Sequence, residues 1–320
     1  MRAITLALLT FLATTTFAAD PAAAVGKARE EMAAGRHSAA LQLLREAMAG
    51  AASLTDLKQR TAALSAIHFY SAVASVGAGD RAQAATELRS FFLYAPSTKL
   101  DTSRYSREFA TLYTEVQREI ARRRASPASF DDAYPGFPPA ASSSAWPTNI
   151  WGASSEFMIL GTPEEKKQWE KLADDVARRS FIDAFWAVRD ADPHTGVNEL
   201  RVELLRRIAF ADVAFVEDID SRGSLSDRGR VFVLLGPPKR VSIRPMTTRE
   251  AGTRAARRTL DAGNAIEQWT YFREQIPHKL PHNEVVFRFV SQGGSSVRLM
   301  QHDFMSDKVV SDTPAALRRD

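Results

Sequence analysis

The chain has 320 residues, of which 45% are hydrophobic and 25% are charged, with a formal net charge of +4 and a pI near 9.4. This composition indicates a folded globular protein rather than a disordered one, and the length allows two domains. The charge excess is too small for a dedicated nucleic-acid-binding protein, so no nucleic-acid partner is expected. The sequence has no cysteine, which excludes disulfides, thiolate metal sites, cysteine nucleophiles and a lipid-modified cysteine.

The first 19 residues have the pattern of a secretory signal peptide. Arg2 supplies a positive charge, residues 4–12 are mostly apolar, and Ala18 and Ala19 are small residues suited to cleavage. An uncleaved membrane anchor is the weaker alternative, because the apolar stretch is shorter than the roughly 20 residues that a spanning helix needs. We therefore expect an exported protein, periplasmic or extracellular, that is cleaved near Ala18 or Ala19 and has no transmembrane span.

Residues 20–125 are predicted to form a helical domain, because they are rich in alanine and other strong helix formers and nearly free of internal proline. Gly35 and Gly79 each interrupt apolar positions spaced three and four residues apart, so two helical hairpins are expected. With Ala40 and Ala84 five positions after the glycines, the hairpins resemble tetratricopeptide-like repeats. The two glycines lie farther apart than in an uninterrupted array, which favours a degenerate helical solenoid.

The helical domain is expected to end with a helix over residues 103–124, whose last turn carries three consecutive arginines. These arginines complement the negative end of the helix dipole, and binding of an anion is the alternative role. Residues 126–150 are rich in proline, serine and alanine, so a semi-extended linker is predicted there. The aromatic side chains of this linker are expected to lie along one of the domains. They are Phe130, Tyr134, Phe137 and Trp146.

Residues 151–310 are predicted to form an α+β domain in which helices precede an antiparallel sheet of about four strands, followed by a C-terminal tail over residues 311–320. The wholly apolar run from Val231 to Leu235, bounded by a polar turn and by Gly236-Pro237-Pro238, predicts a buried strand. The other strands are expected at residues 265–272, 284–290 and 296–300, the last two joined by a turn at Gly293-Gly294.

Five blocks of residues in this region, taken in order, resemble the GWxTD domain of bacterial exported proteins. The counterparts are Phe185, Trp186, Arg189, Asp190 and Pro193; Asn198 and Glu199; Asp227 to Arg230; Gly236 to Pro238; and Trp269 and Tyr271. The naming positions depart from the pattern, because Ser224 stands in place of tryptophan and Ser226 in place of threonine. The resemblance implies an extracytoplasmic protein and no particular activity.

The charged residues of these blocks are expected to connect helix and sheet. Arg189 is predicted to pair with Asp190, and Arg228 or Arg230 with Asp227, in a buried bidentate network. Ser226 and Asp227 are expected to cap the turn that precedes the strand. A structural role is the leading interpretation and ligand binding is the alternative. The candidate binding residues are Arg189, Asp190, Asp227, Arg228, Arg230, Trp269 and Tyr271.

The sequence has no standard enzyme motif: no P-loop, no dinucleotide-binding glycine pattern, no nucleophile elbow and no zinc-protease helix. His278 and His282 make a poor metal pair, because Pro281 interrupts the helical turn that would align them. No cofactor and no metal are expected. The leading prediction is a noncatalytic interaction or scaffold protein with protein partners in the cell envelope. The alternative is an envelope hydrolase or other enzyme of undescribed type that uses Asp190, Asp192, His194 and Asp227.

The segment from Arg244 to Arg258 carries five arginines and one glutamate between two predicted strands. A solvated loop is the leading interpretation of this charge. Contact with an anionic envelope polymer is the alternative.

Overall fold

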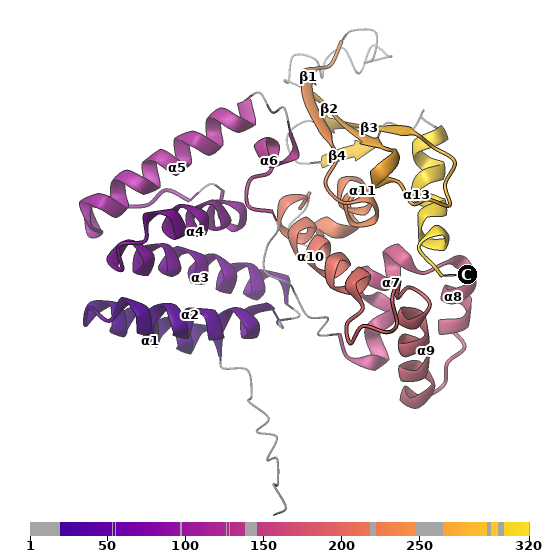
Figure 1. Ribbon diagram of the computed structural model, residues 1–320, viewed down its shortest axis with the longest axis horizontal. Coiled ribbons are helices and arrows are strands. Elements are labelled where there is room, and N and C mark those ends of the chain that lie inside the picture. Colours follow the sequence, from indigo (N-terminus) through magenta and orange to yellow (C-terminus); the bar gives the residue numbers. More distant parts are fainter. Residues whose placement is uncertain are drawn as a thin grey trace, which may run out of the picture.

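In the computed structural model, which describes residues 20–319 except 53, 55, 97, 126, 128, 138–145, 218–221, 248–264, 293–295 and 300–303, helical hairpins are followed by a four-stranded antiparallel sheet (Figure 1). The α+β class is therefore as predicted. The expected signal peptide, the Gly293-Gly294 turn and most of the basic segment 244–258 lie outside the described residues. Among the described helices, none is long and apolar enough to cross a membrane.

Two helical hairpins form the N-terminal region. Helices α1 (Pro21–Ala33) and α2 (His37–Ala52) make the first, and α3 (Leu57–Gly77) and α4 (Arg81–Tyr94) make the second. Gly35 and Gly79 have φ values of 76° and 81° at the turns, a conformation that glycine adopts without steric cost. Ala40 and Ala84 are completely buried, so both hairpin predictions are confirmed.

A third helical layer packs on the second hairpin. After a 3₁₀ turn (η1, Thr102–Arg104), helix α5 (Arg107–Ala125) covers α3 and α4 with one aromatic face. Phe109 on α5 lies 5.6 Å from Phe69 on α3 in an edge-on arrangement, the geometry that aromatic pairs favour. These helices therefore have a core cluster of their own.

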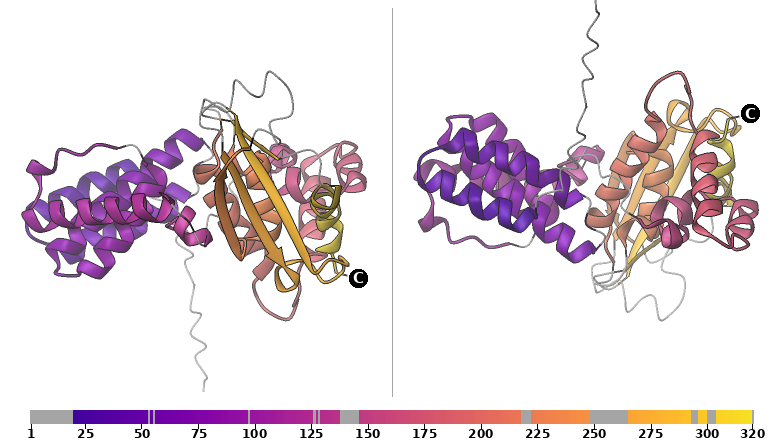
Figure 2. Two further views of the ribbon diagram at one scale, coloured as in Figure 1. Left: turned by 90° about the horizontal axis from the view of Figure 1, so that it is seen from above. Right: turned by 90° about the horizontal axis from the view of Figure 1, so that it is seen from below.

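The C-terminal region packs short helices against a four-stranded sheet. Strands β1 (Arg240–Pro245), β2 (Ala265–Phe272), β3 (Glu284–Gln292) and β4 (Ser296–Leu299) pair antiparallel in that order. The remaining elements are α6 (Phe130–Ala133), η2 (Thr148–Ala153), α7 (Ser155–Leu160), α8 (Pro163–Trp169), α9 (Asp175–Ala187), α10 (Glu199–Ala214), η3 (Gly223–Leu225), α11 (Asp227–Leu235), η4 (Arg273–Gln275) and α13 (Phe304–Ala316). In the sequence, helices α7 to α11 come between the hairpins and the sheet, and Figure 2 shows that they lie on one face of the sheet.

The apolar run from Val231 to Leu235 is a helix, so the predicted strand is wrong. The Ser226 side chain caps α11 by accepting the Gly229 N–H at 3.1 Å, and Gly236, with φ of 79°, ends the helix. From Val231 to Leu235 the helix is apolar on all sides, because α7, α10, α13 and β4 surround it. A short helix buried all round has no polar face and therefore has the sequence pattern of a buried strand. The fourth strand is β1 instead.

Two further segments differ from the sequence predictions. Helix α13 follows the sheet, so the helices do not all precede it, and the expected tail from residue 311 begins inside this helix. In the predicted linker, α6 inserts Phe130 into the core, where it stacks on Phe232 with ring centroids 5.1 Å apart. Phe130, Tyr134 and Phe137 thus lie along the C-terminal region, as their aromatic character predicted.

The two regions share a core. One cluster of buried residues runs from α1, α2 and α3 through α6 to α10, α11 and the sheet. Across the same junction, the Arg60 guanidinium on α3 pairs with the Asp212 carboxylate on α10 at 2.9 Å. The sequence predicts two domains and the shared core predicts one cooperative unit, so the number of cooperative units stays a prediction.

Candidate functional site

The candidate residues around the start of α11 each contact a different element. The Asp227 Oδ2 atom accepts the backbone N–H of Leu299 in β4 at 2.8 Å. The turn itself is capped by Ser226, whose hydroxyl also donates to the Gly223 carbonyl at 2.7 Å. A Cβ atom on Gly229 would lie 1.9 Å from that same carbonyl oxygen, so only glycine fits there. Asp227 therefore connects α11 to the edge strand of the sheet rather than capping the turn.

Arg228 points into the protein and joins a buried polar cluster. Its Nη1 atom donates to the Tyr134 hydroxyl at 3.0 Å and to Glu267 Oε2 at 3.2 Å. The Tyr134 hydroxyl donates to Glu267 at 2.8 Å, and the Trp269 indole N–H donates to the same carboxylate at 2.7 Å. Burial raises the pKa of Tyr134 well above its usual value, and the Glu267 charge adds to the shift. The cluster joins α6, α11 and β2.

The expected pairing of Arg228 with Asp227 is wrong. Among the described residues, Arg230 and Asp227 form no ion pair either. Glu267 on β2 is the partner of Arg228, because successive residues of the first helical turn point in different directions and Asp227 faces β4. Burial lowers the pKa of Arg228, but the neighbouring Tyr134 and Glu267 outweigh it, so that the net pKa is raised. Arg230 is exposed.

The two serines at the naming positions have distinct roles. Ser224 is completely buried; its hydroxyl donates to Asp212 at 2.5 Å and lies 2.8 Å from the hydroxyl of Ser155. The other oxygen of Asp212 accepts the Arg60 guanidinium, so Ser224 extends the ion pair that joins α3 to α10. Ser226 supplies a cap that threonine would also supply. Ser224 therefore belongs to a buried polar network with Ser155, Asp212 and Arg60.

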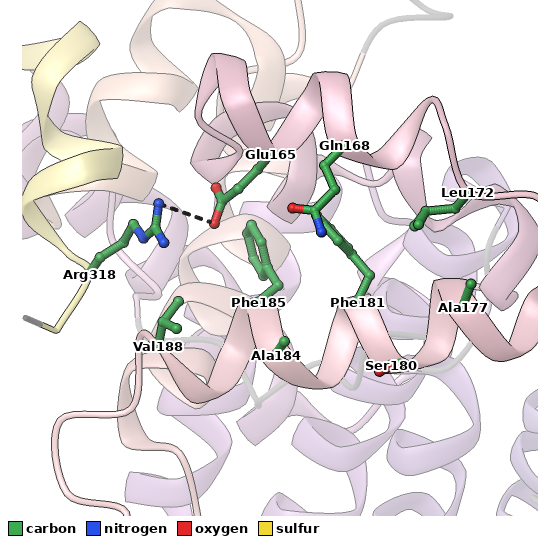
Figure 3. Close-up of a pocket in the computed structure, with 10 residues that line it drawn as sticks. All are labelled: Glu165, Gln168, Leu172, Ala177, Ser180, Phe181, Ala184, Phe185, Val188 and Arg318. Carbon is green, nitrogen blue, oxygen red and sulfur yellow. Dashed lines mark ion pairs between the residues drawn. The ribbon is translucent and has the colours of Figure 1, made fainter.

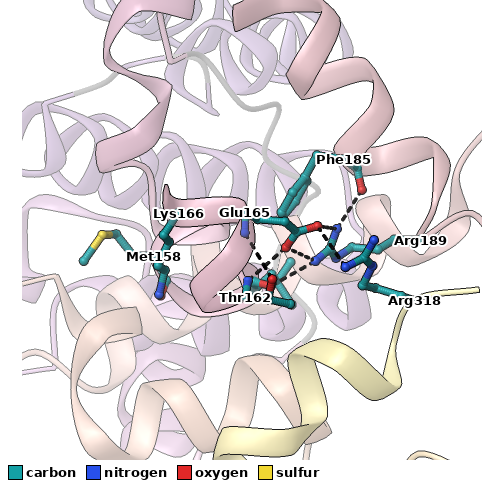
Figure 4. Close-up of polar contacts among 8 residues, drawn as sticks. Met158, Thr162, Glu165, Lys166, Phe185, Arg189 and Arg318 are labelled. Carbon is teal, nitrogen blue, oxygen red and sulfur yellow. Dashed lines mark hydrogen bonds and ion pairs between the residues drawn. The ribbon is translucent and has the colours of Figure 1, made fainter. Parts of the chain in front are cut away.

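Arg189 forms the most buried ion pair of the described residues (Figure 4). Its two terminal nitrogens donate to Glu165 at 2.9 and 2.7 Å, and further bonds reach the carbonyls of Leu160 and Phe185. The Arg189 side chain has no exposed surface and that of Glu165 is 9% exposed. Glu165 also accepts the Thr162 N–H in the capping box of α8. This pair thus holds α8 against the end of α9.

The pKa of Glu165 is lowered overall. Burial raises it, but the hydrogen bonds from Arg189, the Thr162 N–H and the positive charges of Arg189 and Arg318 together outweigh burial. The predicted partner, Asp190, does not contact Arg189 through its side chain. Asp190 Oδ1 instead accepts the Asp192 N–H at 3.2 Å, because the chain turns away from α8 directly after Arg189.

The residues of the catalytic alternative are not brought together. Asp192 and His194 are exposed in the turn between α9 and α10, where Asp192 accepts the His194 backbone N–H at 3.1 Å. Asp190 lies in the same turn, and neither it nor its neighbours line the pocket that contains Asp227. Among the described residues, no group of three or more His, Asp or Glu side chains is placed to hold a metal ion.

Trp269 and Tyr271 are completely buried on the helix-facing side of β2. The Tyr271 hydroxyl donates to the Gly236 carbonyl at 2.8 Å, immediately after α11. Burial raises the pKa of Tyr271 well above its usual value. Both side chains therefore fix β2 to the region around α11, and neither is accessible to a ligand from solvent.

Two hollows flank helix α8. The first, about 370 Å³, lies between α8 and α9 and has Phe181 and Phe185 among its walls and Glu165 and Arg318 at one end, 3.9 Å apart (Figure 3). The second, about 400 Å³, lies between α7, α8, α11 and α13 and contains Asp227, Arg230 and Lys166. Burial and the charge of Arg230 lower the pKa of Lys166, whose ammonium group donates to the Met158 carbonyl at 3.0 Å.

Sequence reasoning missed the carboxylates that pair with the candidate arginines. Glu165 stands three positions after Thr162, a spacing that signals a capping box and not a buried ion pair, and the structure has that box. Glu267 stands in a strand two positions before Trp269, where a carboxylate among buried neighbours signals a buried partner. Asp212 and Tyr134 carried no comparable signal, since their partners are far away in the sequence.

No protein-family model, curated protein or solved structure matches the chain. The roles given above therefore rest on geometry alone. That geometry places the candidate residues in buried ion pairs, helix caps and strand contacts.

Proposed function

We propose that this protein is an exported, noncatalytic interaction or scaffold protein of the cell envelope whose residues 151–310 form a GWxTD-like domain. One observation supports this most: two of the candidate charged residues are held in buried ion pairs, Arg189 with Glu165 and Arg228 with Glu267. A catalytic acid or base needs access to substrate and freedom to exchange a proton. Side chains engaged in buried ion pairs have neither.

The architecture is suited to holding another protein. Stacked helical hairpins offer extended surfaces to partners, and here the hairpins are joined to the sheet region by a shared core and by the Arg60–Asp212 ion pair. A rigid connection between two surfaces lets a partner contact both without a large entropic cost of ordering them. The expected partners are proteins of the cell envelope.

Export is part of this proposal and has a direct test. Mass spectrometry of the protein recovered from outside the cytoplasm should give a mature chain that begins at Ala19 or Asp20. An intact Met1 on protein from that compartment would contradict cleavage, and protein confined to the cytoplasm would contradict export.

The interaction function is tested by cross-linking in intact cells. We expect a specific envelope protein to be captured and, once purified, to bind the mature protein with saturable stoichiometry. Asp227→Asn is the control, because asparagine keeps an oxygen acceptor for the Leu299 N–H but removes the carboxylate. A captured envelope substrate that is turned over by the parent protein and not by Asp227→Asn would contradict the noncatalytic role.

A further inference from the structure

A third pocket lies at the junction between the helical hairpins and the sheet region. Its volume is about 310 Å³. Helices α4 and α5 provide part of its wall, and α6, α10 and β1 provide the rest. Its lining includes Leu93, Arg124, Ala133, Tyr134, Val213 and Ile243. Because both regions supply walls, this pocket exists only when the two are packed together.

The pocket is aliphatic and open to solvent. Ile243 lies opposite Glu267 in the β1–β2 register, so its side chain is on the helix-facing side of the sheet, yet it is 46% exposed. Tyr134 contributes its ring, since its hydroxyl is engaged by Glu267 and Arg228. Exposed aliphatic surface within a hollow favours an apolar side chain as occupant.

Arg124 is the charged residue of this pocket. No described carboxylate lies within ion-pair distance of its guanidinium, whereas the preceding Arg123 pairs with Glu119 at 2.9 Å. An aliphatic hollow lined by one exposed arginine, Arg124, is complementary to an apolar side chain next to a carboxylate.

We propose that this junction pocket binds a segment of a partner protein in which an aliphatic side chain enters the hollow and an adjacent carboxylate pairs with Arg124. The proposal rests on the interaction function proposed above and names the surface that carries it. It also gives the shared core a role, because binding requires α4 and α5 to be held against α10 and β1.

A peptide selection tests the pocket and does not require the natural partner. Random heptapeptides displayed on phage are selected on the mature protein and counter-selected on Arg124→Glu. We expect enrichment of sequences with Leu, Ile or Val adjacent to Asp or Glu. The most enriched peptide is then synthesised, labelled and titrated by fluorescence anisotropy. Its affinity should fall at least tenfold for Arg124→Glu and for Ile243→Asp, with circular dichroism confirming that both variants are folded.

Two controls make the result specific. Arg122→Glu changes the same charge on the same exposed helix end outside the pocket, and it should leave the affinity within about twofold of the parent. A peptide with lysine in place of its acidic residue should bind Arg124→Glu better than the parent protein.

The pocket assignment would be overturned if no peptide is enriched over the Arg124→Glu background, if enriched peptides lack the aliphatic and acidic pair, or if dodecanoate at equal concentration displaces the bound peptide. A peptide that binds parent and Arg124→Glu equally would place protein binding elsewhere on the molecule. That last result would reject the pocket and leave the interaction function intact.

Discussion

Glu165 and Arg189 show how single residues of this chain are committed to structure. A buried arginine is costly unless its donors are bonded, and here two carbonyls and one carboxylate accept from its two terminal nitrogens, while Nε has no partner. The guanidinium also lies over the Phe185 ring, 3.7 Å from its centroid. Removal of the Glu165 carboxylate would leave the buried Arg189 guanidinium without its counterion.

We therefore expect Glu165→Gln to lower the free energy of unfolding by about 3 kcal/mol at pH 7, the cost of breaking a buried ion pair on one side. Urea denaturation measures this loss. Glu164→Gln is the matched control, because Glu164 is the exposed neighbour on the same helix, and it should change stability by less than about 0.5 kcal/mol. Equal effects of the two substitutions would contradict the assignment of the pair.

The same pair predicts a pH dependence of stability. The pKa of Glu165 is lower in the folded protein than its usual value of 4.5, so its contribution is fully present above pH 4.5 and is lost as the pH falls through the lower folded value. The stability difference between the parent and Glu165→Gln should be constant from pH 7 to about pH 6 and should narrow below pH 4.5. A difference that widens on acidification would have the wrong sign for this ion pair.

Substitutions at Ser224 and Ser226 test the roles that the structure gives these two side chains. Ser226→Thr keeps the cap of α11 and should leave the unfolding midpoint nearly unchanged, whereas Ser226→Ala should cost about 1 kcal/mol. Ser224→Trp should cost more than about 3 kcal/mol, because an indole would have to enter a closed site and would leave Asp212 without its hydroxyl donor. Thermal unfolding with a parental midpoint for Ser224→Trp would contradict this account.

At the scale of elements, α11 shows what local sequence does not determine. Its apolar run is compatible with a buried strand or a buried helix, and the choice depends on caps and on tertiary surroundings. Ser226 starts the helix, and Arg207 on α10 ends it by donating to the carbonyls of Val233 and Leu234. The arginine comes from another element, so the sequence around α11 gives no sign of it.

The helical hairpins were predictable because their signals are local. Gly35 and Gly79 mark turns, and apolar residues spaced three and four positions apart identify the helices on either side. The edge strand β1 was missed because Arg240 and Arg244 alternate with apolar residues in a pattern typical of an exposed loop or a half-buried strand. The partners of the candidate arginines were missed for a different reason, since Glu165 and Glu267 lie 24 and 39 residues from Arg189 and Arg228.

The end of α11 gives an element-scale prediction. Gly236 has φ of 79°, and a Cβ atom there would lie 3.0 Å from the Arg207 guanidinium. Gly236→Ala should therefore cost about 2 kcal/mol in backbone strain and disturb the helix cap. Gly26→Ala is the control, because Gly26 is helical with no neighbour within 4 Å of a new Cβ, and alanine there should stabilise by about 0.5 to 1 kcal/mol. Urea denaturation of both variants measures the contrast.

At the scale of the whole molecule, the shared core raises the question of how many cooperative units the chain has. Composition predicted a linker over residues 126–150 between two units. Yet the described part of this segment places Phe130 in the core at 3% exposure, between Phe232 and Trp269. Because a side chain of this linker completes the core of the C-terminal region, unfolding of the linker would also destabilise that region.

We expect the two regions to unfold together. All five tryptophans lie between residues 146 and 269, so their fluorescence reports on the C-terminal region, whereas circular dichroism at 222 nm is dominated by helices that include α1 to α5. Urea titrations followed by the two signals should have coincident midpoints, as a single cooperative unit requires. Phe130→Ala should cost about 3 to 4 kcal/mol and shift both midpoints by the same amount. Separate midpoints, or a Phe130→Ala shift confined to tryptophan fluorescence, would instead support two independent units joined by a linker.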